Sequence, residues 1–119
     1  VLDVIKEEDL QSNALEVGFY LFQGLLNLKN KYEIIGDVRG RGLFLGVELI
    51  KESNQMMPAP EDARTAINLM RDRNILLSTD GPDNNVIKIK PPLVFNRKNA
   101  DYLLDSFDNV LSEMTIKVK

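Results

Sequence analysis

The sequence predicts an α+β fold, with a small, mostly antiparallel sheet and helices packed on one face of it. Two long stretches, residues 10–28 and 100–114, repeat apolar residues every three or four positions, as helices with one buried face do. Residues 86–90 alternate apolar and charged side chains, which is the period of a half-buried strand. The predicted order is helix, strands, helix, strand, strand, helix. A length of 119 residues fits one domain.

The first helix is predicted to end near Lys31, before a turn that starts at Gly36. Its apolar stripe is made of residues three and four apart, widened by their neighbours: Leu10, Ala14, Leu15, Val17, Leu21, Phe22, Leu25, Leu26 and Leu28. Gly18 and Gly24 each cost roughly 1 kcal/mol relative to alanine inside a helix. Either they allow close packing against a neighbour or they lie on the less buried face, and both explanations stay open.

Residues 34–50 combine glycines with residues that favour strands, so we expect strands with a bend or bulge where another backbone comes close. Residues 51–60 have no periodicity and contain two prolines, which predicts a loop. Pro60 suits the first position of a short helix that ends near Asn74. The predicted buried face of this helix comprises Ala63, Ile67 and Met70.

Residues 75–78 are predicted to form a short apolar strand, and residues 80–85 have the composition of a turn. The strand at 86–90 ends at Pro91-Pro92, because proline cannot donate a hydrogen bond to a strand ladder. Asn96 is a plausible N-cap for the last helix. The apolar face of that helix is predicted to comprise Ala100, Leu103, Phe107, Val110, Leu111 and Met114.

The composition excludes several classes of function. The chain has a net charge of −3 and no concentrated basic patch, so we expect no nucleic-acid binding. It contains no cysteine and no histidine, which removes disulfides, thiolate zinc sites and the commonest general base. We therefore expect no metal site. The longest apolar stretches are only a few residues long, which argues against a membrane span.

The sequence begins within a helical pattern, without Met and without a cap residue. We interpret this beginning as a cut through a longer chain, inside a helix that enters the domain. No signal peptide is evident, because charged residues interrupt the first ten positions. A cytoplasmic or mitochondrial location is the expectation.

A family resemblance rests on two segments, residues 36–49 (GDVRGRGLFLGVEL) and residues 85–93 (NVIKIKPPL). Residues 1–5 and 13–14 support it. In this order and spacing they resemble class III aminotransferases, which depend on pyridoxal 5′-phosphate (PLP). The resemblance implies that residues 1–119 are the C-terminal small domain of a fold-type I PLP enzyme. Residues 1–9 would then end the helix that links it to a large domain.

The resemblance also implies a division of labour. The large domain, absent from this sequence, would supply the Schiff-base lysine and bind PLP. No catalytic, cofactor-binding or metal-binding residue is therefore expected in this chain, which should be inactive alone. The expected partners are the chain's own large domain and a small-molecule amine substrate, in a homodimer or homotetramer.

Residues 78–82 and 88–92 most resemble the phospho-lyase branch of the family, which is also labelled alanine–glyoxylate aminotransferase-like. Its best-known members eliminate phosphate from phosphoethanolamine or phosphohydroxylysine. Aminotransferases of this class often place an arginine at the position of Lys88, where it meets a substrate carboxylate. Arginine matches a carboxylate with two parallel hydrogen bonds, whereas lysine is a compact point charge. Lysine fits a phosphate-bearing substrate without that carboxylate better.

We predict that Lys88 and Arg39 bind the substrate. The alternatives are that Lys88 and Lys90 belong to a solvated sheet face opposite the apolar side chains of the same strand, and that Arg39 braces the fold. Arg41 is expected to be a solvated surface charge, and Glu48 to form a salt bridge with an arginine. Turn formation accounts for Asp80 and Asp83 without a metal.

Two other functions stay open. The chain could belong to an ordinary class III transaminase acting on alanine and glyoxylate or on an ω-amino acid. It could also be a free-standing α+β module that binds a metabolite or a protein. A domain of a larger enzyme should expose apolar side chains on its first helix and near its glycine-rich segment, and a natural module should not.

Overall fold

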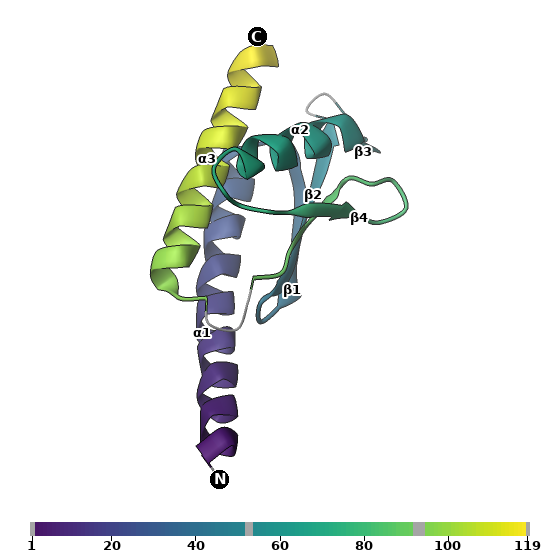
Figure 1. The fold of residues 1–119 in the computed structure, drawn as a ribbon. Helices are drawn as coiled ribbons and strands as arrows, with labels where there is room; N and C mark the ends of the chain where they lie inside the picture. The colour runs from purple at the N-terminus through teal and green to yellow at the C-terminus, as the bar shows by residue number, and fades with distance from the viewer. Residues whose placement is uncertain (1, 52–53, 92–94, 119) are drawn as a thin grey trace.

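The computed structural model describes residues 2–51, 54–91 and 95–118, and within these the side chains of residues 12–51, 57–91 and 95–114. Within these ranges, three helices and five strands follow one another (Figure 1). In order they are α1 (Leu2–Lys31), β1 (Ile35–Arg41), β2 (Phe44–Lys51), β3 (Asn54–Pro58), α2 (Pro60–Arg71), β4 (Ser78–Asp80), β5 (Val86–Ile89) and α3 (Arg97–Val118). No helix in these described ranges has the length and apolarity that a membrane span requires.

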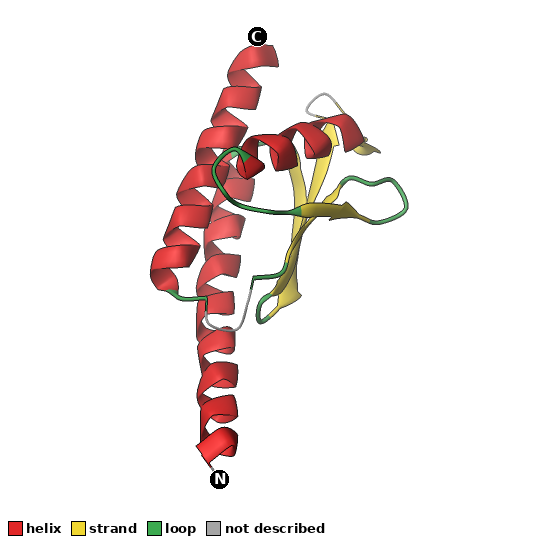
Figure 2. Cartoon of the chain, viewed as in Figure 1, coloured by secondary structure: helices red, strands yellow, loops and turns green. Residues whose placement is uncertain are grey.

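The strands form one antiparallel sheet in the order β1-β2-β5-β4, and β3 pairs with the end of β2. All three helices lie on one side of this sheet (Figure 2). α1 contacts β1 and runs beside α3, and α2 packs on β4, β5 and α3. The inward-facing strand residues are almost fully buried: Leu45, Val47, Leu49, Ile87 and Ile89. The predicted fold class is confirmed.

The end of α1 at Lys31 agrees with the prediction, and its glycines turn out to be sites of close packing. A Cβ on Gly18 would lie 2.1 Å from the carbonyl oxygen of Gly42, in the turn between β1 and β2. A Cβ on Gly24 would lie 2.3 Å from Cδ1 of Leu104 on α3. The surroundings of Leu10 lie outside the described side chains.

Several local predictions are wrong. The segment 51–60 is not a plain loop, because Asn54–Pro58 forms β3 and pairs with the end of β2. β3 ends at Pro58, and a strand at the edge of a sheet tolerates the missing N–H of a proline. Gly36 does not start a turn but lies within β1, where the register with β2 shifts.

The region after α2 also differs from the prediction. The helix ends at Arg71, and Asn74 takes a left-handed conformation (φ 65°), which few residues other than glycine and asparagine adopt easily. The fourth strand is Ser78–Asp80 rather than residues 75–78. Ile75 instead donates its backbone N–H to the carbonyl of Met70, a bond that closes the C-terminal end of the helix after the left-handed Asn74.

The last helix follows the prediction. The Asn96 side chain accepts a hydrogen bond from the backbone N–H of Asn99 (2.9 Å), and the Asn99 side chain accepts one from the N–H of Asn96 (3.1 Å). This reciprocal arrangement satisfies two N–H groups that the helix itself cannot use. The six predicted apolar residues of α3 are all buried. The strand predicted at 86–90 is present as β5, and Pro92 lies outside the described residues.

Candidate functional site

The pairing of the strands brings Arg39 and Lys88 to the same face of the sheet, opposite the helices. Arg39 of β1 pairs with Gly46 of β2, and Gly46 pairs with Lys88 of β5. Lys88 in turn pairs with Ser78 of β4. Because paired residues in an antiparallel sheet point to the same side, these residues form one row across four strands. The row joins both predicted substrate-binding residues.

A hollow of about 430 Å³ lies over this row. Residues of β1, β2 and β5 and the turn after β4 surround it, including Arg39, Phe44, Gly46, Glu48, Asp80 and Lys88. Gly46 sits between the two cations and contributes no side chain, so the middle of the hollow stays open. An anionic group placed between the two cations has to compete with the carboxylates of Glu48, Asp80 and Asp83, which also line the hollow.

Each cation of the row has a carboxylate partner. Arg39 Nη2 lies 3.2 Å from Glu48 Oε2, and its Nε lies 3.6 Å from Asp37 Oδ2. Lys88 Nζ lies 3.7 Å from Asp80 Oδ2. The prediction that Glu48 pairs with an arginine is confirmed. Pairs as exposed as these contribute about 0–1 kcal/mol each, so a well-placed anion can compete for the cations.

Phe44 was not singled out from the sequence, although it lies beside both lysines. Its ring centroid is 5.9 Å from Lys88 Nζ and 5.7 Å from Lys90 Nζ, within the range of cation–π attraction. Lys88 is half-buried and Lys90 exposed, on the face opposite Ile87 and Ile89, as the alternation predicted. Period-two spacing from Phe44 through Gly46 would have placed Phe44 on this face.

Asn85 lies at the end of the hollow and holds that end in place. The sequence did not reveal this structural role. Its side chain is buried and donates a hydrogen bond to the carbonyl of Leu49 (2.9 Å). The Asn85 carbonyl accepts one from the N–H of Leu49 (2.8 Å). These two bonds attach the turn that follows β4 to β2. The turn itself was predicted, and Gly81 (φ 87°) and Asn84 (φ 53°) supply its left-handed positions.

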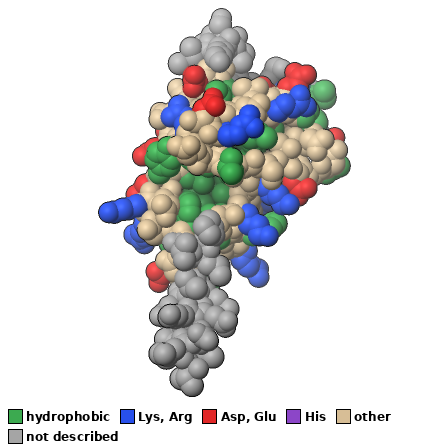
Figure 3. Space-filling model, in the orientation of Figure 1, with side chains coloured by type: hydrophobic (Ala, Val, Ile, Leu, Met, Phe, Trp, Pro, Cys, Tyr) green, Lys and Arg blue, Asp and Glu red, His purple; other side chains and the backbone are tan. Residues whose placement is uncertain are grey.

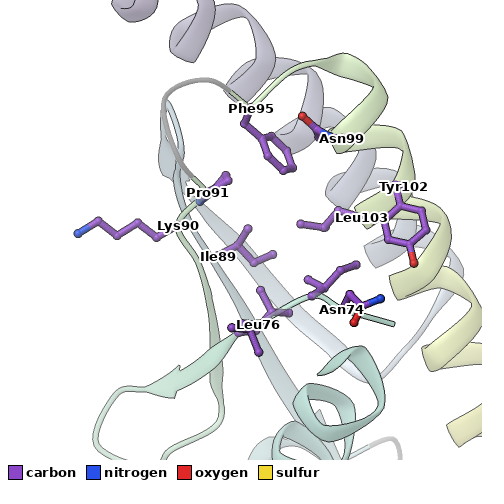
Figure 4. A pocket seen from close by; sticks show the side chains of 11 residues that line it. Asn74, Leu76, Ile89, Lys90, Pro91, Phe95, Asn99, Tyr102 and Leu103 are labelled. Carbon is purple, nitrogen blue, oxygen red and sulfur yellow. The ribbon is translucent and has the colours of Figure 1, made fainter. Parts of the chain in front are cut away.

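A second pocket of about 320 Å³ lies on the helix side of the sheet, and most of the residues that line it are apolar (Figure 4). Leu76, Ile89, Phe95 and Leu103 are among its lining residues. Hydrophobic side chains also gather between the long helices and the sheet in the space-filling view (Figure 3). Two polar side chains of this pocket already have hydrogen-bond partners. The Asn99 side chain accepts a bond from the N–H of Asn96, and the Tyr102 hydroxyl donates one to the carbonyl of Arg73. The pocket therefore has less to recognise a charged substrate than the hollow at Lys88.

The comparisons with known proteins agree on one family. The family model described as "Aminotransferase class-III" matches residues 1–111. The chain belongs to the class III aminotransferase family. "Alanine--glyoxylate aminotransferase 2-like" of Drosophila melanogaster is 46% identical over 113 residues, which make up 94% of this chain and 23% of that protein. "Alanine--glyoxylate aminotransferase 2 homolog 2, mitochondrial" of Arabidopsis thaliana is 45% identical over 114 residues, 96% of this chain and 24% of that protein.

A solved structure gives a further comparison. A phospholyase from Arthrobacter in complex with phosphoethanolamine is 40% identical, with a TM-score of 0.87 over 93% of this chain and 26% of that one. This chain thus spans about a quarter of the length of the family members that it matches. Enzymes of the family depend on PLP and act on small amines.

The side chains described here do not fit PLP. The lysine that binds PLP in a class III aminotransferase is activated in a buried site, whereas each lysine with a described side chain is exposed or half-buried. No buried side-chain nitrogen or oxygen among the described residues lacks a hydrogen-bond partner that a cofactor could replace. We therefore assign no reaction step through PLP to this chain.

Proposed function

We propose that this chain is the substrate-closing C-terminal small domain of a PLP-dependent phospho-lyase acting on phosphoethanolamine or phosphohydroxylysine. PLP and its lysine would belong to a large domain outside the sequence. For phosphoethanolamine the overall reaction consumes one water and yields acetaldehyde, ammonia and phosphate. The role of this chain is to bind the phosphate end and to exclude water.

The observation that carries the proposal is Lys88 at the hollow. A phosphate monoester carries nearly two negative charges near neutral pH, and a lysine ammonium attracts it without the planar geometry that a carboxylate–arginine pair requires. Arg39 lies across Gly46 from Lys88 and is the second candidate ligand. The similarity to the Arthrobacter phospholyase supports the same assignment.

The domain role is supported by the exposed apolar side chains. Leu15 and Phe19 lie one helical turn apart on α1, and they are 61% and 63% exposed. Phe44, which follows the glycine-rich segment, is 52% exposed. A domain that docks against a large domain is expected to expose apolar side chains on its first helix and near its glycine-rich segment, where these three lie. This argues against the free-standing module.

An ordinary transaminase is the second candidate, because both curated relatives above are named as alanine–glyoxylate aminotransferases. The mitochondrial name of the Arabidopsis relative supports a mitochondrial location over a cytoplasmic one. A homodimer or homotetramer stays a prediction.

The substitution Lys88→Ala in the full-length protein separates the two candidates. We expect kcat/KM for phosphoethanolamine to fall about 10²-fold, because a charge-assisted contact to the phosphate is lost. The kcat/KM for transamination of alanine with glyoxylate should change less than about threefold, because alanine has no phosphate group that Lys88 could contact. The reverse pattern would favour the transaminase.

A further inference from the structure

Two cations of the polar face, Lys90 and Arg41, form no salt bridge among the described residues. Arg39 is paired with Glu48 and Asp37, and Lys88 with Asp80. Lys90 forms none of the salt bridges found among the described residues, and its ammonium instead lies over the ring of Phe44. Of these two, Lys90 lies two residues along the chain from Lys88, whereas Arg41 belongs to β1 and pairs with Phe44. Lys90 is therefore the unbalanced cation that can act as a partner of Lys88.

The backbone places Lys90 where it can act together with Lys88. Residues two apart on an extended strand point to the same side, about 6.6 Å apart along the chain. Phe44 pairs across the sheet beside them, since its neighbour Leu45 pairs with Ile89. Lys90 is among the residues that line the pocket on the helix side, but in Figure 4 the end of its side chain points away from that pocket and from Ile89. Both ammonium groups thus stand on the outer face, next to one aromatic ring.

An exposed phenylalanine between two lysines has a physical consequence. The negative face of the ring attracts each ammonium group and so holds two like charges close together that would otherwise move apart in solvent. A site with two lysines distinguishes a phosphate dianion from a carboxylate, because the second negative charge gains most from the second cation. Asp80 already neutralises part of the charge of Lys88, so a dianion at this place needs the positive charge of a second lysine.

We propose that Lys90 is a second cation for the phosphate end of the substrate, held beside Lys88 by the ring of Phe44. The proposal rests on the proposed function and deepens it, since it assigns the preference for a phosphate dianion to a pair of lysines. Lys90 is a specificity-determining residue in this scheme, and Phe44 is a positioning residue that does not itself need to touch the phosphate.

The test uses the full-length protein loaded with PLP, with Lys90→Gln, Lys90→Arg and Phe44→Leu compared with the wild type. Lys90→Gln is expected to raise KM for phosphoethanolamine about tenfold with kcat changed less than about twofold. Lys90→Arg keeps the charge and should restore most of the affinity. Phe44→Leu keeps apolar bulk without the ring face and should raise KM about threefold. Lys98→Gln, an exposed lysine on α3, is the matched control and should have no effect.

Calorimetric titration of the same proteins with inorganic phosphate gives a readout that does not depend on turnover. Lys90→Gln should weaken phosphate binding about tenfold. If the wild type releases no phosphate from phosphoethanolamine, the proposed function fails, and the titration alone then decides about Lys90. An unchanged phosphate affinity in Lys90→Gln, or an equal loss in Lys98→Gln, would overturn the proposal.

Discussion

At the scale of single residues, the proposed function depends on Gly46, which leaves the floor of the hollow open. It lies between Arg39 and Lys88 in the row across the sheet. A Cβ at this position would come within 3.1 Å of Val86 Cγ1 and would occupy the floor between the two cations. The proposed site therefore needs the open floor at Gly46 as well as the two charges.

Gly46→Ala in the full-length protein is therefore expected to raise KM for phosphoethanolamine. A rise of about five- to tenfold corresponds to the loss of about one contact with the phosphate. Val86→Ala added to Gly46→Ala relieves the crowding but leaves the methyl group on the floor. If the double variant recovers the wild-type KM, crowding and not occupation of the floor was the cause, and the assignment of this site is wrong.

At the scale of elements, two glycines of α1 control how closely the helix approaches its neighbours. Gly18 touches the backbone of the turn at Gly42, whereas Gly24 touches the end of the Leu104 side chain. A side chain can change rotamer, but a carbonyl oxygen in a tight turn cannot move without moving the hairpin. The two positions therefore respond differently to the same change.

Gly18→Ala should destabilise the 119-residue chain by about 1–2 kcal/mol, because overpacking outweighs the gain in helix propensity. Gly24→Ala should lie within about 0.5 kcal/mol of the wild type, because Leu104 is only partly buried and can shift. Urea unfolding followed by circular dichroism measures both. Equal effects of the two substitutions would contradict the contact between α1 and the turn.

The C-terminal end of α1 is tied to α3 by Asp108. The Tyr32 hydroxyl donates a hydrogen bond to its carboxylate, and Lys31 Nζ lies 3.0 Å from Asp108 Oδ1. The hydrogen bond from Tyr32 is the main cause that holds the pKa of Asp108 below its ordinary value, against the opposing effect of burial, and Lys31 adds to it. Burial first, and then this same bond, raises the pKa of Tyr32.

These shifts predict a pH dependence of the stability of the chain. A lowered pKa means that Asp108 stabilises the fold above its unfolded pKa of about 3.9, and that this contribution is lost as the pH falls through the folded value. Asp108→Asn should therefore lower the free energy of unfolding at pH 6. In the variant, this free energy should also fall less than in the wild type as the pH is lowered from 5 through the folded pKa of Asp108. Urea unfolding at several pH values checks this. Parallel pH profiles for the variant and the wild type would exclude the assigned role.

The same elements explain how much the sequence could predict. α1, β5 and α3 follow from periodicity, and the cap at Asn96 from its residue type, because these signals are local. β3 was missed because its strand character comes from pairing with β2 rather than from its own composition. The row that joins Arg39, Gly46 and Lys88 depends on the register of two strand pairs, which the alternation of side chains within one strand does not reveal. The roles of Arg39 and Lys88 in binding stay predictions.

At the scale of the whole molecule, the proposed function makes the outer face of the sheet a binding face and assigns the reactive centre to another part of the protein. The helices of this chain close one side of the sheet, and the cations of the hollow stand on the other. The described side chains do not fit PLP, and the chain spans about a quarter of its relatives. These observations support a domain that meets its substrate only when a cofactor-bearing region lies opposite the hollow.

The most direct test is the release of inorganic phosphate from phosphoethanolamine in the presence of PLP, measured for the full-length protein and for the 119-residue chain. We predict that the full-length protein releases phosphate together with acetaldehyde and ammonia, and that the chain alone releases none and gives no absorbance band of bound PLP. Turnover by the chain alone, or transamination without phosphate release by the full-length protein, would contradict this account.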